Sequence, residues 1–441
     1  MMKKKIFAVA AAGAMTAATA VPALALENEF HGMFRVFGTI SNYGSTNASG
    51  STIAGVLTPD LSSDAPTRGY MEQRARLMYI AKANDDLKLV THFEIDSRWG
   101  DNAYNSNNTT RNNGGAIGAD QTNLETKNVY LDFNIPSTPL NFKVGIQPWV
   151  DSYGGILVNA DMAGALATAK YAGFTNSLGW FRFNEDAGSL PGKATRDFMI
   201  LDTKYNLSKD IRIGGSYYLL TDDRAASDNT YTHMIGVNAD MKFDPVTVGA
   251  FGMYQFGDTP STVNSDLSAF LVGTTAKAKV GIGTVKLAAL YVSGEQNANT
   301  DSSAFQPINS ESSFYAADMQ IMLRNKWNVN NDRSLVQNIS NFYGAFVGYD
   351  ANITDKLFAN VNAGFGFAAQ TAGKGTAAEP DSSYRGTELN AEVGYKLFDN
   401  MTVMAQGAYF ILGDFYQKTK GGVDNNLDDP YQARLMVNYA F

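Results

Sequence analysis

Apolar and polar residues alternate along many short stretches of this chain, and the alternation is clearest near the two ends. The last eleven residues read YQARLMVNYAF and stop on an aromatic residue. One face carries Tyr431, Ala433, Leu435, Val437, Tyr439 and Phe441, and the other carries Gln432, Arg434 and Asn438. A period of two predicts a β-strand with an apolar surface on one side and a polar surface on the other.

Two further stretches, 70–83 and 87–99, flank a tight turn at residues 84–86, and each carries charges on one face. These faces carry Glu72, Arg74, Arg76 and Lys82 in the first stretch and Lys88, His92, Glu94, Asp96 and Arg98 in the second. At the middle of a bilayer, Lys or Arg on the lipid-facing side of a strand costs about 2–4 kcal/mol, and Asp or Glu costs less. We therefore expect both charged faces to point inward, toward water or protein.

A rhythm of long polar loop, strand, short turn and strand continues to the end of the chain. It predicts strands at about 30–41, 70–83, 87–99, 123–134, 140–149, 166–174, 178–184, 197–205, 210–220, 231–243, 246–257, 266–280, 284–292, 341–351, 356–368, 386–398, 401–412 and 431–441. The predicted fold is all-β: a transmembrane antiparallel up-and-down β-barrel of 18 strands, with short periplasmic turns and long extracellular loops. The two short strands within 166–184 also fit one loop, so 16 strands is the alternative.

The first 25 residues have the pattern of a secretory signal peptide. Three lysines, Lys3 to Lys5, precede an apolar run from Ile6 to Ala20, and Ala23-Leu24-Ala25 forms a small-x-small cleavage pattern. The run is too short to span a bilayer. Cleavage after Ala25 leaves a single barrel domain, residues 26–441, of 441 − 25 = 416 residues, and the loss of three lysines takes the net charge from −8 to −11.

The composition agrees with a barrel and disfavours several other classes of protein. The chain has no cysteine, so disulfides, thiolate metal sites and a lipid-attachment cysteine are excluded. A mean hydropathy of −0.20 suits strands of which only alternate residues meet lipid. The 22 Tyr and 26 Phe residues suit aromatic girdles at the membrane surfaces. A pI near 5.0 disfavours nucleic-acid binding.

The sequence indicates neither an enzyme nor a cofactor site. His31, His92 and His233 are the only histidines, and none stands in an evident Ser-His-acid arrangement. The acidic stretch 424–429 lacks the ligand spacing and the glycine of a calcium-binding EF-hand loop. We therefore predict no catalytic residue, no metal and no cofactor.

Several stretches together resemble Gram-negative outer-membrane porins of the general diffusion type. They are FHGMFRVFG in the first strand, EQRARL (72–77), LETKNVYLDF (124–133), FKVGIQPW (142–149) and the terminal NYAF. A barrel of 16 to 18 strands is too wide for side chains to fill, so an aqueous channel is expected. The resemblance implies passive diffusion of small hydrophilic solutes and ions, a homotrimer, and a third external loop that folds into the lumen and constricts it.

Carried onto this chain, the constriction loop is residues 150–166, with Asp151 and Asp161 opposite a basic ladder on the barrel wall. The ladder residues are Arg74, Arg76 and Arg98, with Lys88 and Lys143 nearby. Glu72, Glu94 and Asp96 interrupt the ladder. The charges of the wall either pair across strands and stiffen it or act directly on permeating ions, and both can hold.

Partners follow from the predicted location in the outer membrane. They are outer-membrane lipid, lipopolysaccharide, and the barrel-assembly machinery, for which the C-terminal face Leu435, Val437, Tyr439 and Phe441 resembles the recognition sequence. A second hypothesis is a structural barrel that sheaths or docks another envelope component, such as an electron-transfer cytochrome, and it requires a lumen without an inward loop. The two longest connections are 42–69 and 293–340, and 314–323 fits a short helix or an extra strand. The sequence predicts neither the solute nor the ion selectivity.

Overall fold

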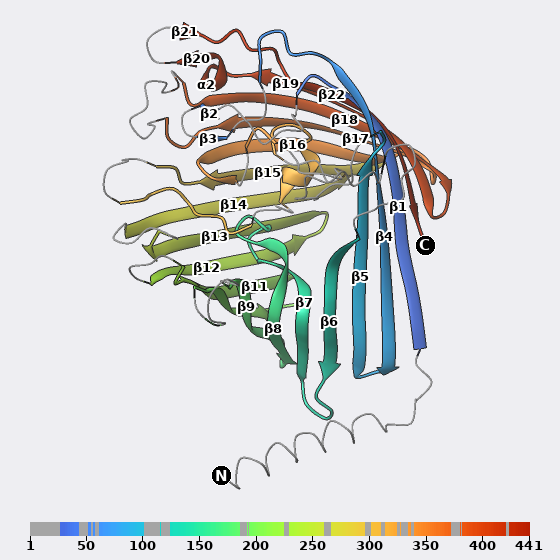
Figure 1. The fold of residues 1–441 in the computed structure, drawn as a ribbon, viewed down its shortest axis with the longest axis vertical. Coiled ribbons are helices and arrows are strands. Elements are labelled where there is room, and N and C mark those ends of the chain that lie inside the picture. The colour runs from blue at the N-terminus through green and yellow to red at the C-terminus, as the bar shows by residue number, and fades with distance from the viewer. Residues whose placement is uncertain are drawn as a thin grey trace.

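The computed structural model describes residues 27–43, 61–100, 115, 124–185, 192, 194–224, 229–259, 266–295, 301–309, 314–323, 327, 334–336, 339–371, 380, 382–419 and 423–441, and the backbone of 52–53 and 56–57. Eighteen strands form one sheet that closes into a barrel (Figure 1). They are β1 (Glu27–Ser41), β4 (Arg68–Asn84), β5 (Leu87–Arg98), β6 (Glu125–Asn134), β7 (Leu140–Val150), β8 (Asn159–Tyr171), β9 (Phe174–Asn184), β10 (Arg196–Asn206), β11 (Ile211–Asp222), β12 (Thr230–Phe243), β13 (Val246–Asp258), β14 (Asp266–Val280), β15 (Gly283–Val292), β16 (Phe342–Asn352), β17 (Leu357–Phe367), β18 (Tyr384–Phe398), β19 (Met401–Leu412) and β22 (Tyr431–Ala440).

Each barrel strand pairs with the next in an antiparallel manner, and the last strand closes the barrel on the first. The closing register runs from Met33↔Ala440 to Ser41↔Gln432. The backbone N–H and C=O groups of Phe441 bond those of Gly32, at 3.0 and 2.9 Å. The predicted barrel of 18 strands is therefore confirmed, and the alternative of 16 is wrong.

Alternate residues of each strand face opposite sides of the barrel wall, as the sequence pattern predicted. In β22, Leu435 is 67% exposed on the outer side, whereas Arg434 is 4% and Met436 is 1% exposed on the inner side. The outer surface carries many such exposed apolar side chains. An apolar outer surface of this kind is what contact with lipid requires.

The two ends of the barrel differ in the length of their connections. Eight short turns, the longest of them 135–139, lie at one end, which we call the short-turn end. Nine longer connections lie at the other, the long-connection end. These connections contain two short hairpins, β2 (Thr52–Ile53) with β3 (Val56–Leu57) and β20 (Lys418–Thr419) with β21 (Val423–Asp424). They also contain the 3-10 helix η1 (Tyr315–Asp318) and the short helix α2 (Asp414–Gln417). Of the two alternatives for 314–323, a short helix or an extra strand, the structure therefore contains the short helix.

The predicted constriction loop 150–166 is wrong in its second half, because β8 already begins at Asn159. The loop proper is residues 151–158. The predicted strand 166–174 lay too far along the chain because the tight turn at Ala172-Gly173 was not predicted. Both turn residues have positive φ, 47° and 85°. Two such residues form the tight turn that suits the twist of a hairpin.

Parts of three connections fold back into the barrel and cover its inner wall. They are residues 151–158, the described parts of the connection between β15 and β16, and helix α2. Their buried side chains join one hydrophobic cluster with inward residues of the strands from β8 to β19. The loop 151–158 also bonds the longer connection, because Phe314 N–H donates to Gly154 C=O at 2.8 Å. Side chains of these segments therefore occupy part of the lumen beside these strands.

One sequence prediction concerns the start of the chain. Residues 1–25, the predicted signal peptide, lie outside the described residues. No helix in the described part of the chain is both long and apolar enough to cross a membrane.

Candidate functional site

Strands β4 and β5 set acidic and basic residues directly opposite each other on the inner wall. Their register pairs Glu72 with Arg98, Arg74 with Asp96, and Arg76 with Glu94. Side chains directly opposite on one face of an antiparallel pair lie close enough to interact, and opposite charges stabilise the pair. The period-two pattern of both segments thus produces a ladder of three cross-strand ion pairs. We call these six residues the charged wall.

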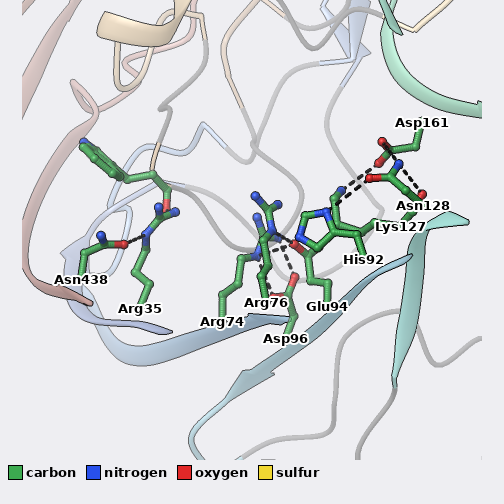
Figure 2. A network of polar contacts seen from close by, with 11 residues as sticks. Arg35, Arg74, Arg76, His92, Glu94, Asp96, Lys127, Asn128, Asp161 and Asn438 are labelled. Carbon is green, nitrogen blue, oxygen red and sulfur yellow. Dashed lines mark hydrogen bonds and ion pairs between the residues drawn. The ribbon is translucent and has the colours of Figure 1, made fainter. Parts of the chain in front are cut away.

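Arg74 is the centre of the charged wall (Figure 2). Its Nε and Nη2 donate to the two carboxylate oxygens of Asp96 at 2.8 and 2.6 Å, which is a bidentate pair. Its Nε also lies 3.2 Å from Glu94 Oε2, and Arg76 Nε donates to the same oxygen. Arg98 Nη2 lies 3.3 Å from Glu72 Oε1. The expected pairing of wall charges across strands is therefore what the structure shows.

The exposed fractions of these side chains identify the part of the network that meets solvent. The side chains of Glu94 and Asp96 are 5% exposed, and that of Arg74 is 13% exposed. The side chain of Arg76 is 29% exposed. The network therefore presents a guanidinium to the lumen and holds its carboxylates underneath.

Two further arginines extend the array onto β1 and β22. Arg35 Nε donates to Asn438 Oδ1 at 3.2 Å, and its guanidinium lies 4.8 Å from the ring of Trp327 (Figure 2). Arg434 Nε donates to Thr39 Oγ1 at 3.0 Å. Neither arginine was predicted as a site residue, although both occupy polar positions of alternating segments. Arg35 lies directly opposite Arg74 in the register of β1 with β4, whereas Arg434 comes beside β1 only because β22 closes the barrel on that strand.

A second group of polar residues lies on the side of β5 that is away from β4. It connects β5, through β6, to the hairpin of β7 and β8. His92 Nδ1 lies 3.3 Å from Asn128 Oδ1, and Asn128 Nδ2 donates to Asp161 Oδ1 at 2.7 Å. Lys127 Nζ lies 2.9 Å from Asp161 Oδ2. Figure 2 shows this group beside Glu94 and Arg76. Asp161, predicted in the constriction loop, is therefore a residue of strand β8 with two partners on β6.

These contacts cross a gap in the strand pairing. The ladder between β6 and β7 ends at Val129↔Ile146, while β7 stays paired with β8 as far as Val150↔Asn159. Toward the long-connection end, β7 therefore leaves β6 and follows β8. Lys127, Asn128 and Asp161 bridge β6 and β8 at this point.

Asp151 does not face the arginines. It is 6% exposed, and its carboxylate accepts four backbone N–H bonds within its own loop. The donors are Tyr153 at 2.6 Å, Gly155 at 2.9 Å, Leu157 at 2.8 Å and Val158 at 2.8 Å. Burial raises the pKa of Asp151 to about 6, and the four N–H bonds oppose that rise. Asp151 therefore fixes the shape of the inward loop.

Lys143 lies on β7, opposite Asp132 in the register with β6. Its ammonium is 5.6 Å from the centre of the Tyr130 ring. Lys88 pairs with the same Asp132 at 3.5 Å. These two lysines, predicted to lie near the ladder, stand nearer the short-turn end than the charged wall and are separate from it.

A buried carboxylate on the wall holds the second inward segment, residues 314–323. Glu388 on β18 is fully buried and accepts the N–H groups of Gln320, Ile321 and Met322 at 2.6, 3.1 and 2.6 Å. Lys286 on β15 bonds Asp318 at 2.8 Å. The role of Glu388 was not predicted, because nothing in its own strand shows that its partners are backbone groups of a distant connection.

The described residues contain no cluster of three or more His, Cys, Asp or Glu side chains that could hold a metal ion.

Comparisons with known proteins place the chain by its fold. No protein-family model matches it, and no curated protein matches it in sequence. Solved outer-membrane porins do match in structure. OccK2 (OpdF) of Pseudomonas aeruginosa has a TM-score of 0.57 and 16% identity, and covers 94% of this chain and 98% of its own. The structure of OccK2 with glucuronate has a TM-score of 0.55 at 13% identity and the same coverage.

Two further matches have the same coverage of 94% and 98%. The outer membrane protein OpdK of P. aeruginosa has a TM-score of 0.55 at 12% identity, and OccAB2 of Acinetobacter baumannii has a TM-score of 0.56 at 10% identity. At these identities the likeness concerns the fold. The predicted resemblance to Gram-negative porins is confirmed at that level.

Proposed function

We propose that this protein is an outer-membrane porin that lets small hydrophilic solutes and ions diffuse passively across the membrane. The observation that carries the proposal is a closed barrel of 18 strands with apolar side chains outside and a charged wall inside. Barrels of about 16–18 strands enclose more space than the side chains of the wall can fill. The porins of similar fold support the same class of function.

The route for solutes in this proposal runs between the charged wall and the inward segments. The segments 151–158 and 314–323 lie over the inner faces of the strands from β8 to β19. On the opposite side, the partly exposed charges of the network are Arg76, Lys127 and Asp161, with side chains 29, 24 and 29% exposed. Two cationic groups and one anionic group at a narrow place give a field that acts on ions of both signs. We therefore propose weak rather than strict ion selectivity.

The solute class follows from the polarity of this route. Guanidinium, ammonium and carboxylate groups form hydrogen bonds with hydroxyl and carboxyl groups of solutes. Small sugars and sugar acids are the proposed class, and the glucuronate bound by OccK2 is a useful probe.

The sheath hypothesis needs a lumen without inward segments. Because two segments cover the inner wall, this hypothesis has no support.

The proposal also assigns location and orientation. The short-turn end would face the periplasm and the long-connection end the exterior, as in bacterial single-chain barrels. Lipid would contact the apolar outer face, and lipopolysaccharide the long connections. The barrel-assembly machinery would recognise Leu435, Val437 and Tyr439 on the outer side of β22, together with the exposed Phe441 that follows this strand. A homotrimer remains part of the proposal.

Reconstitution of the purified protein tests the proposed function. We expect step-like currents in planar phosphatidylcholine bilayers with potassium chloride, and swelling of vesicles in glucose and in glucuronate. Protein unfolded by heat before reconstitution is the control. Tight bilayers and vesicles that do not swell, with protein that still migrates as a folded barrel on gels, would contradict the proposal.

A further inference from the structure

Four lysines surround a hollow at the short-turn end of the barrel, far from the charged wall. The hollow has a volume of about 480 Å3. Its lining comes from the turns and strand ends between β10 and β15. The lysines are Lys209, Lys242, Lys277 and Lys279, and the other charged or hydroxyl-bearing lining residues are Asp210, Asp244, Thr247 and Thr284.

The strand register places most of these groups on one row of the inner wall. Lys242 pairs with Thr247, Thr247 with Lys277, and Lys277 with Lys286, across β12, β13, β14 and β15. Lys279 and Thr284 form the next pair toward the turn. Because side chains alternate in each strand, Lys242 shares a face with the buried Met234, and Lys277 shares one with the buried Leu271. The lysines therefore point toward the lumen rather than toward lipid.

Like charges directly opposite each other on adjacent strands destabilise a sheet unless something compensates them. Lys286 is compensated, because it lies 2.8 Å from both Asp318 and Asp350. Among the residues that the structure describes, Lys242, Lys277 and Lys279 have no carboxylate within ion-pair distance. Lys209 lies 3.9 Å from Asp210, and nearby Asp240 is held by Arg212 at 2.6 Å. Three ammonium groups thus line one hollow without an ion pair among the described residues, although the carboxylates of Asp210 and Asp244 line it too.

Lys242, Lys277 and Lys279, which we call the lysine row, also lie in a different part of the barrel from the charged wall. In the strand order, eight strands separate β13 from β4 in either direction around the barrel, so the two arrays stand on opposite walls. The charged wall pairs every arginine with an acid or an amide, which leaves little net attraction for a free anion. The lysine row leaves its charges available.

From this geometry we propose that Lys242, Lys277 and Lys279 form a binding site for a small multivalent anion, such as a phosphate group or a polycarboxylate, at the exit of the lumen. Lysine binds phosphate as a point charge, and the hydroxyls of Thr247 and Thr284 add hydrogen-bond donors to the hollow. The site rests on the proposed function, because a solute would reach it through the channel. It would gather anions at the short-turn end and slow their release.

Current block by inorganic phosphate tests this site. Phosphate is added at pH 8, where the dianion predominates, to one side and then to the other of single channels that carry chloride current. We expect block at lower phosphate concentrations from the side of the short turns. In the triple variant Lys242→Gln, Lys277→Gln and Lys279→Gln, the half-blocking concentration should rise roughly tenfold, a change of about 1.4 kcal/mol in binding.

Three other lysines toward the same end provide a matched control. The variant Lys170→Gln, Lys356→Gln and Lys396→Gln removes the same total charge outside the hollow and should block like the wild type. The variant with arginine at positions 242, 277 and 279 keeps the charge and should retain block. If the triple glutamine variant does not fold, Lys277→Gln alone should still weaken block measurably.

The outcomes separate the two proposals. A channel that does not conduct overturns the proposed function. A conducting channel that phosphate blocks equally in the wild type and in the glutamine variant of the hollow overturns the lysine site only. Equal loss of block in the control variant would also overturn the site, because general charge at the rim would then explain the effect.

Discussion

The inner wall of this barrel has two kinds of surface, and they are built in different ways. On β4 and β5 the charged wall satisfies itself, because each acid stands opposite a base in the strand register. On β10 to β13 the inward positions carry Phe198, Tyr218, Met234 and Met253, and all of them are buried. Those residues depend on inward connections to cover them. We call the wall that these connections cover, on the strands from β8 to β19, the covered surface.

The difference shows that a large apolar residue on the lumen side indicates that another part of the chain covers it. Water in a lumen would leave Phe198 and Tyr218 exposed, whereas the packing of Trp149 against both rings removes them from solvent, with ring centres 5.8 and 5.6 Å apart. The chain then holds the cover in place with carboxylates that accept backbone N–H groups, Asp151 in one segment and Glu388 for the other. The charged wall needs no such cover.

The pairing of β1 with β22 closes the barrel, and we call it the closing seam. It supports both surfaces, so its loss should have the largest effect. Deletion of Phe441 removes the residue that bonds Gly32 and whose ring lies against the space where a Cβ of Gly32 would stand. We expect little or no folded barrel in the outer membrane and degradation in the periplasm. Heat-modifiable migration on gels of membrane fractions measures this.

The control for the seam is Phe441→Tyr, which retains the ring and the backbone. It should assemble nearly as well as the wild type. Normal amounts of folded barrel after the deletion would refute the role of the terminal residue.

The covered surface should respond next most strongly, to loss of Glu388. In Glu388→Leu the N–H groups of Gln320, Ile321 and Met322 lose their acceptor. An unsatisfied buried N–H costs about 1–3 kcal/mol, so segment 314–323 should detach from the wall while the strands stay paired. We expect a several-fold larger and noisier single-channel conductance.

Leu389→Ala is the matched control for Glu388→Leu, since Leu389 is the next residue of β18 and is 51% exposed on the outer side. It should leave the conductance unchanged. A wild-type conductance in a folded Glu388→Leu barrel would mean that this carboxylate does not hold the segment in place.

The charged wall should change selectivity more than stability. Arg74→Gln with Arg76→Gln leaves Glu94 and Asp96 without their partners, so the reversal potential in a salt gradient should move toward cations, with roughly a twofold change in permeability ratio. Asp161→Asn should move it toward anions. Asp151→Asn should have little effect, because that carboxylate faces its own loop.

Arg212→Gln serves as the control for these selectivity variants, because its ion pair with Asp240 lies at the short-turn end. An unchanged reversal potential in both Arg74→Gln/Arg76→Gln and Asp161→Asn would show that the network does not border the narrowest point.

Much of the barrel was predictable from the sequence, because strand structure is local. Period-two alternation located all 18 strands, and 166–184 was displaced only because the Ala172-Gly173 turn was missed. Ion pairs between β4 and β5 were predictable too, since a tight turn at 85–86 fixes their register.

The resemblance implied an inward third loop, but the contacts of the covered surface were not predicted, because they join distant parts of the chain. Glu388 and Gln320 are 68 residues apart, and Arg434 and Thr39 are 395 residues apart. One local feature did point to the cover. Segment 198–201, FMIL, is apolar on both faces, and a strand whose inner face meets only water has no reason to be so.

The least disruptive measurement is the environment of single labels along β5, which tests the alternation on which both surfaces depend. Spin labels at Phe93 and Ile95 should report lipid, and labels at Glu94 and Asp96 should report water or protein, because the carboxylates are 4% exposed and lie on the inner wall with Arg74 and Arg76. Accessibility to oxygen and to a water-soluble relaxation agent separates the two environments. A one-residue shift of register would exchange the two sets of signals. That exchange would remove the charged wall from the lumen and end the comparison with the covered surface.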